Sequence, residues 1–220
     1  MTTRTEQSIG FIQWQIQALL AFPHCKQYRD IGMRVILLLI SITALMGILQ
    51  LPSLHEWAQW DHNAIIEGQW WRIVTGNLTH TNLYHLGMNV GGLWIISFIF
   101  REQISIRQFI VVFTGLCIAV GSLLLLTSMQ LYVGLSGVLH GLFGFYAMQE
   151  YRLGRKSSLY LLIGLTAKII WEQCFGSPTG TEALIHAKVA IDAHLFGSVF
   201  GVTLSIATDI LQTIKTKKEL

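Results

Sequence analysis

Residues 109–127 read FIVVFTGLCIAVGSLLLLT, a run of 19 residues with no acidic, basic or histidine side chain. A helix of about 20 apolar residues is long enough to cross a bilayer. The run therefore predicts a membrane span. Composition extends this prediction to the whole chain, because 52% of its 220 residues are hydrophobic and 12% are charged, whereas about 25% are charged in a soluble domain. We exclude a soluble globular domain and a disordered chain.

Similar apolar stretches on both sides of this run predict an all-α polytopic membrane protein, built as one bundle over residues 33–211. We expect a tail at 1–32 before the bundle and a basic tail at 212–220 after it. Residues 8–22 are apolar but too short to span, and we expect an interfacial helix there. A signal peptide is the alternative interpretation, but it would need a basic first region and a small-residue cleavage site, and this stretch lacks both. The predicted spans are 33–51, 82–100, 109–127, 135–151, 158–175 and 189–211.

The distribution of basic residues predicts the orientation. If the N-terminus is cytoplasmic, 12 of the 15 lysine and arginine residues fall on the cytoplasmic side. Basic residues are enriched in cytoplasmic loops of membrane proteins, so we expect both termini in the cytoplasm. The net charge of +3 is then explained by topology, and we do not expect nucleic acid as a partner.

Polar residues inside predicted spans are costly in lipid and indicate functional sites. In the second span, His85 and Asn89 are four residues apart and share one helix face. Hydrogen bonds that tie neighbouring helices together are the alternative explanation.

The fourth span carries GLSGVLHGLFG at 134–144. A helix of about 17 residues is roughly 25 Å long, shorter than a core of ~30 Å, so Ser136 is expected in a first turn below the outer surface. Unpaired N–H groups at this positive helix end suit a developing oxyanion. Gly137, Gly141 and Gly144 lie on one face and permit a close neighbouring helix. A packing motif is the alternative explanation of these glycines.

The sixth span carries AHLFGSVFG at 193–201. His194 shares a face with Gly197 and Gly201, so two glycine-lined helices that meet would bring it towards Ser136. Serine with histidine is the minimum for an activated nucleophile. Asp192 lies about 200° round the helix from His194 and is badly placed to orient its ring. We therefore predict a Ser–His dyad.

These motifs together resemble the rhomboid family of intramembrane serine proteases. The resemblance implies that Ser136 is the nucleophile, that His194 is the base, and that His85 and Asn89 help to form the oxyanion hole with support from Gly134. It implies no cofactor and no metal, a lipid bilayer as surroundings, and single-span membrane proteins as substrates. The motifs are Trp71–Arg72, His80, His85 with Asn89, GLSG at 134–137, and AHxxGxxxG at 193–201.

Two positions depart from the usual family pattern. Gly76 stands where many bacterial members carry a histidine, and His140 stands where typical members place an aromatic residue that packs on the catalytic histidine. The HG pair at 140–141 resembles the rhombosortase subfamily, which implies a bacterial inner membrane, a site that opens to the periplasm, and substrates with a Gly-rich C-terminal anchor. We expect His140 to hydrogen-bond to a water or to the substrate, and we expect Gly134, Gly137 and Gly141 to border the cavity. A general rhomboid protease that acts on other single-span anchors is the alternative.

Other classes fit the sequence less well. A metalloprotease would be expected to carry HExxH, which the sequence lacks, although His80, His85, His140 and His194 could in principle gather a metal. A transporter would show two related halves with broken helices, and no such symmetry is visible in the sequence. A non-catalytic relative that acts as a membrane binding module would be expected to lack Ser136 or His194.

The charge pattern predicts that position 182 faces outward and position 155 faces the cytoplasm. In a cysteine-free background, Glu182→Cys should react with a membrane-impermeant thiol reagent in intact cells. Arg155→Cys should react only after permeabilisation. The reverse pattern would contradict the orientation.

Overall fold

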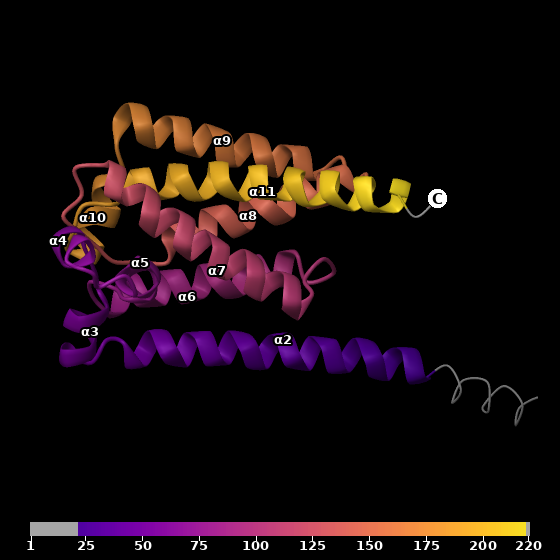
Figure 1. Ribbon diagram of the computed structural model, residues 1–220, viewed down its shortest axis with the longest axis horizontal. Coiled ribbons are helices and arrows are strands. Elements are labelled where there is room, and N and C mark those ends of the chain that lie inside the picture. Colours follow the sequence, from indigo (N-terminus) through magenta and orange to yellow (C-terminus); the bar gives the residue numbers. More distant parts are fainter. Residues whose placement is uncertain (1–21, 219–220) are drawn as a thin grey trace, which may run out of the picture.

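The computed structural model describes residues 22–218, so the interfacial helix expected over 8–22 falls outside it apart from its last residue. Within this range, six helices of 17 residues or more form an elongated bundle (Figure 1). They are α2 (Phe22–Ile48), α6 (Leu83–Ile99), α7 (Ile106–Leu123), α8 (Ser136–Arg152), α9 (Ser158–Phe175) and α11 (Ile191–Lys218).

Each long helix lies on one predicted span, with ends that differ most in α2 and α11. Judged by length and hydropathy alone, the membrane-spanning candidates in the described range are Ile106–Leu126 and Ile191–Ile210. A third candidate is Gly32–Ile48 taken together with α3 (Pro52–Ala58), which bends from it by 103°. Helix α6 is apolar but shorter. The number of membrane crossings therefore stays a prediction.

Short elements cover one end of the bundle, where Figure 1 shows α3, α4, α5 and α10 together. Two of them, β1 and β2, pair antiparallel, with Trp60 opposite Tyr132. Arg72 ties this region together, because its guanidinium donates to the carbonyls of Glu56 and Gln59 and to the Gln69 side chain. The elements are β1 (Trp60–Asp61), α4 (His62–Ile66), α5 (Arg72–Thr75), η1 (Gly76–Leu78), η2 (Leu124–Leu126), β2 (Leu131–Tyr132) and α10 (Thr179–Ile185).

The two ends of the described chain lie at the opposite end of the bundle, with the α6–α7 and α8–α9 connections (Figure 1). Two arginines there form ion pairs: Arg155 contacts Glu150, and Arg152 contacts Asp209 on α11. Both chain ends on one side are what an even number of crossings requires. The side that faces the cytoplasm stays a prediction.

Helices α8 and α11 cross with glycines of each helix against the backbone of the other. A Cβ added to Gly197 would lie 1.9 Å from the carbonyl oxygen of Gly137, and one added to Gly201 would lie 2.0 Å from that of Gly141. Real Cβ atoms do not approach backbone oxygens so closely, so only glycine fits at these positions. The expectation that the two glycine-lined faces meet is confirmed. This crossing sets where the first turns of α8 and α11 lie relative to each other.

We therefore predict that Gly197→Ala destabilises the protein strongly. The added methyl meets a helix backbone that cannot rotate aside, and overpacking of this kind costs about 1–3 kcal/mol or more. Thermal unfolding in detergent would measure the loss. Gly115→Ala on α7 is the matched control, because a Cβ there meets nothing within 4 Å, and a helical Gly→Ala change gains about 0.5–1 kcal/mol. Equal midpoints for the two variants would contradict the prediction.

Candidate active site

The α8–α11 crossing brings Ser136 and His194 together. Ser136 is the first residue of α8, and His194 lies in the first turn of α11. The Ser136 Oγ is 2.8 Å from the His194 Nε2, which is hydrogen-bond distance for a hydroxyl that donates to a neutral ring nitrogen. His194 is buried at 5% exposure, and Ser136 is half-buried and lines a cavity. This arrangement can activate a serine hydroxyl.

Glu172 is a third member of the site that our sequence analysis did not name. It lies in the last turn of α9, and its Oε2 is 2.9 Å from the His194 Nδ1. Its Oε1 is 2.6 Å from the Nζ of Lys168, one turn earlier. Apart from Lys168, Glu172 is the only acidic or basic residue in α9. The rule that charged residues inside a span indicate function would have found it.

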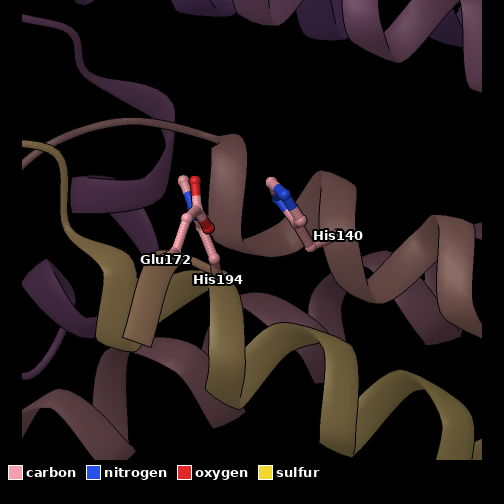
Figure 2. Close-up of side chains that lie close together, drawn as sticks. All are labelled: His140, Glu172 and His194. Carbon is pink, nitrogen blue, oxygen red and sulfur yellow. The ribbon is translucent and has the colours of Figure 1, made fainter. Parts of the chain in front are cut away.

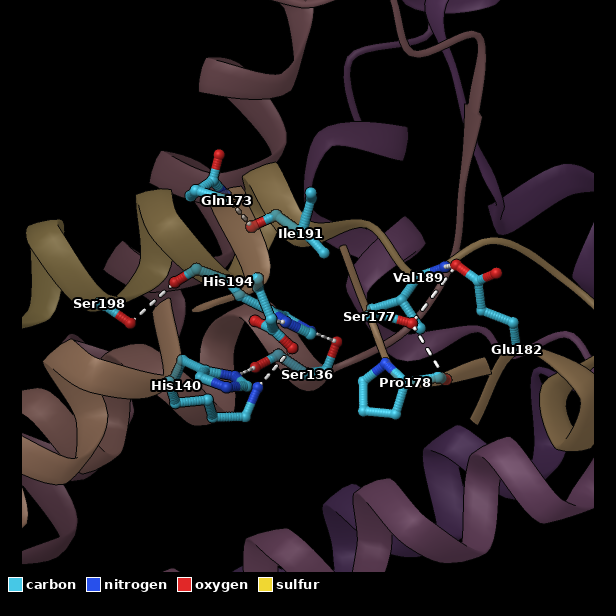
Figure 3. A network of polar contacts seen from close by, with 12 residues as sticks. Ser136, His140, Gln173, Ser177, Pro178, Glu182, Val189, Ile191, His194 and Ser198 are labelled. Atoms are coloured by element: carbon cyan, nitrogen blue, oxygen red, sulfur yellow. Dashed lines mark hydrogen bonds and ion pairs between the residues drawn. The ribbon is translucent and has the colours of Figure 1, made fainter. Parts of the chain in front are cut away.

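His140 packs flat on His194. The two ring centroids are 4.1 Å apart with an angle of 18° between the planes, and Figure 2 shows both rings beside Glu172. The Nδ1 of His140 is 2.7 Å from the carbonyl oxygen of Ser136 (Figure 3). His140 thus occupies the place of a stacking aromatic, and its Nδ1 bonds to its own helix, whereas we expected a bond to water or to substrate.

The same three residues could be taken for a metal site, because ligand atoms of His140, Glu172 and His194 all lie within 4.8 Å of one another. A metal needs ring nitrogens whose in-plane lone pairs converge on one point. Two nearly parallel stacked rings direct their lone pairs along separate parallel planes. The carboxylate already contacts Lys168 and His194. This arrangement suits a hydrogen-bonded catalytic array better than a metal centre.

His85 and Asn89 face the same cavity as Ser136, from α6. The Nδ2 of Asn89 donates to the carbonyl of His85, and the Nδ1 of His85 contacts the Thr81 hydroxyl. Gly134 has a φ of +128°, and a Cβ there would lie 2.8 Å from the Cε1 of His85. A glycine is therefore required both for the backbone conformation and for the approach of the His85 ring. The side chains of His85 and Asn89 thus line the same cavity as Ser136.

Gly76 departs from the family pattern for a steric reason. A Cβ at this position would lie 2.4 Å from the Cβ of Trp60. Trp60 is fully buried, and its indole N–H donates to the carbonyl of Gly121 on α7. The Gly76 carbonyl also accepts from the N–H of Gly134. A histidine cannot fit at position 76 unless the Trp60 backbone moves.

The cavity above Ser136 has a volume of about 420 Å³ and is bordered by α6, α8, α11 and the segment that includes α10. Helix α10 is held to the start of α6, because Thr81 and Asn82 donate to the carbonyls of Ile185 and Leu184. Gly137 and Gly141 do not border this cavity, since both face α11. Our expectation that they do so is wrong: the close helix crossing uses their small size.

Two buried groups beside the cavity are neutral at physiological pH. Burial, together with the neighbouring His85 and His55, lowers the pKa of His80 to about 3. His80 packs edge-on against His85, with 5.0 Å between ring centroids. Burial raises the pKa of Tyr132, whose hydroxyl donates to the Gly134 carbonyl. Both groups shape the wall next to His85 and Gly134 without adding charge.

Comparison with known proteins gives concordant results. The family described as the rhomboid domain matches residues 67–208, more than half of the chain. A relative from Bacillus subtilis (strain 168), which bears the name "Putative rhomboid protease YdcA", is 26% identical over 147 residues. The similarity covers 64% of this chain and 68% of the relative. Ser136, His140, Glu172 and His194, as well as His85 and Asn89, fall inside the matched family range.

Proposed function

The chain belongs to the rhomboid family of integral membrane proteins, and we propose that it is an intramembrane serine endopeptidase with Ser136 as nucleophile and His194 as general base. The family implies the protease activity. The observation that carries the residue assignment is the 2.8 Å contact between the Ser136 Oγ and the His194 Nε2 beside a cavity that both residues line.

The chemistry follows from this contact. The Nε2 of His194 takes the Ser136 hydroxyl proton while the Oγ bonds to the scissile carbonyl carbon, and the carbonyl oxygen becomes an oxyanion. When the carbon–nitrogen bond breaks, His194 gives the proton to the leaving amine. Water then attacks the acyl ester and gives a proton to His194, and His194 passes this proton to the Ser136 Oγ as the ester carbon–oxygen bond breaks, which regenerates both side chains. An amine in place of water would make the enzyme a transpeptidase.

Oxyanion stabilisation is assigned to groups that surround the Oγ of Ser136. The backbone N–H of Ser136, at the first position of α8, has no acceptor within its own helix. His85 and Asn89 border the same space. In the free enzyme one N–H of the Asn89 amide donates to the carbonyl of His85, and the second N–H is left to donate to the oxyanion. Gly134 supports this wall by admitting the His85 ring.

The proposed substrates are C-terminal Gly/Ser-rich anchors of exported proteins, cut near the outer face of a bacterial inner membrane. The HG pair at 140–141, whose histidine packs on His194, supports the assignment to the rhombosortase subfamily, from which these substrates follow. Glycine is a poor helix former, so such an anchor unwinds easily at the cleavage point. A basic tail after the anchor would remain cytoplasmic by the charge rule that orients the enzyme.

For catalysis, we predict that Ser136→Ala and His194→Ala each abolish cleavage of a membrane-anchored reporter in liposomes while the protein remains folded. The double variant should be no worse than either single one, because the pair acts as a unit. Asn89→Ala should retain activity, with a loss of about 10–1000-fold, as expected for one oxyanion donor among several.

Asp192→Asn serves as the control for this series. Asp192 lies two residues before His194, and no hydrogen bond between them is found in the described range. The variant should cleave at close to the wild-type rate. A loss as large as that of His194→Ala would overturn the assignment, as would normal cleavage by Ser136→Ala.

For the substrate, we predict that a reporter with a Gly/Ser-rich segment, an apolar helix and a basic tail at its C-terminus is shortened only when active enzyme is co-expressed. Replacement of the small residues by valine or isoleucine should block the change, because β-branched residues cannot supply the same local unwinding. Immunoblotting measures the size difference. Equal cleavage of the β-branched reporter, or efficient cleavage of N-terminal anchors alone, would favour a general rhomboid protease.

A further inference from the structure

We propose that Glu172 is a positioning residue for His194, and that Lys168 holds its carboxylate charged inside the bundle, so that the site works as a serine–histidine–glutamate array. This inference rests on the proposed function. The inference goes beyond that function because it assigns roles to two residues of α9, Lys168 and Glu172. Both residues lie outside the motifs by which the chain resembles the family.

Each ring nitrogen of His194 lies at hydrogen-bond distance from one side chain of the site. The Nδ1 and Nε2 of His194 contact Glu172 and Ser136 at 2.9 Å and 2.8 Å. A carboxylate can only accept, so the His194 Nδ1 carries the proton in this bond. The Nε2 is then left with a free lone pair that faces the Ser136 hydroxyl. Glu172 thereby selects the tautomer that general-base catalysis needs.

The contact between His194 and Glu172 is buried. The side chains of His194 and Glu172 are each 6% exposed. Hydrogen bonds and charges act more strongly in such an environment than in water. When His194 takes the serine proton it becomes a cation, and the carboxylate beside it stabilises that cation. The stacked ring of His140 covers one face of His194. Glu172 and Ser136 therefore hold the His194 ring within its plane, and His140 restricts its movement out of that plane.

Lys168 balances the negative charge of the Glu172 carboxylate. A lone carboxylate at this depth would be costly, and Lys168 supplies the compensating charge at 2.6 Å. The Lys168 side chain is 48% exposed and borders a second, largely apolar cavity of about 430 Å³ between α6, α8 and α9, which His140 also borders. Lys168 thus links the carboxylate of Glu172, which contacts His194, to the side of the bundle that this second cavity borders.

The bundle contains a matched control for a purely structural ion pair. Glu150 on α8 is also buried, at 2% exposure, and also contacts one basic residue and one further donor, Arg155 and Ser158. It lies 14 residues after Ser136 on the same helix, which is roughly 21 Å along the axis. If buried carboxylates here act only by tying helices together, Glu150 and Glu172 should be equally important.

The test measures cleavage kinetics and the rate at which a fluorophosphonate probe labels Ser136, with full-length protein in liposomes. Glu172→Gln keeps the shape but lets the amide donate to the Nδ1, which favours the wrong tautomer. We expect kcat to fall about 100–10,000-fold while KM changes less than about threefold, because the substrate cavity is untouched. Glu172→Asp should recover part of the loss, and Glu150→Gln should keep near-normal kcat.

The variant Lys168→Met examines the charge-balancing role. It should lower kcat by a smaller factor than Glu172→Gln. The double variant should be no slower than Glu172→Gln, because Lys168 acts through Glu172. If the double variant regained activity, the Glu172→Gln defect would come from an unpaired lysine and the positioning role would be overturned. A further loss in the double variant would overturn the role of Lys168.

Failure of this inference is distinguishable from failure of the proposed function. If wild-type protein is labelled at Ser136 and folded Glu172→Gln is labelled and cleaves at the same rate, the protease stands and the positioning role is overturned. If wild-type protein is not labelled at all, the proposed function itself fails. Parallel losses in Glu150→Gln and Glu172→Gln would reduce both glutamates to structural ties.

Discussion

The close crossing of α8 and α11 is the constraint on which the site depends. Backbone carbonyls of Gly137 and Gly141 occupy the space that side chains at 197 and 201 would otherwise fill. In lipid, helices associate through packing and hydrogen bonds, without the hydrophobic driving force that acts in water. The same contact therefore stabilises the bundle and fixes the separation between the first turns of α8 and α11. Ser136 and His194 project from those turns.

Once these turns are fixed, the remaining polar groups have little freedom. Glu172 reaches His194 from α9, and His140 reaches it from α8. The polar side chains meet one another, so their cost in the membrane interior is offset by mutual hydrogen bonds. At the other end of α8, Glu150 meets Arg155 and Ser158 on the same principle. Helix α9 thus contacts its neighbours through a buried carboxylate at each end.

How far the sequence predicts this arrangement depends on the kind of signal. The helix ranges follow from hydropathy, and the meeting of α8 with α11 follows from glycine spacing, because both signals are local or periodic. Glu172 could have been singled out as a charged residue inside a span, but its contact with His194 depends on how α9 is rotated against α11, and the sequence of α9 does not specify that rotation. The pairing of β1 with β2, and of Gly76 with Trp60, joins segments that are distant in sequence and lack a periodic pattern.

The helices that form the site differ in hydropathy, and α11, which carries His194, is long and apolar enough to be a membrane-spanning candidate. Helix α7 supplies no polar group to the array and is among the candidates that pass by length and hydropathy. Helices α8 and α9 do not qualify as membrane-spanning candidates by length and hydropathy. They carry Ser136, His140, Lys168 and Glu172. Helix α8 packs against α6, α7, α9 and α11, so much of its surface meets protein instead of lipid. A helix enclosed in this way can carry polar residues that a lipid-facing helix could not, and Ser136 and His140 lie on such a helix.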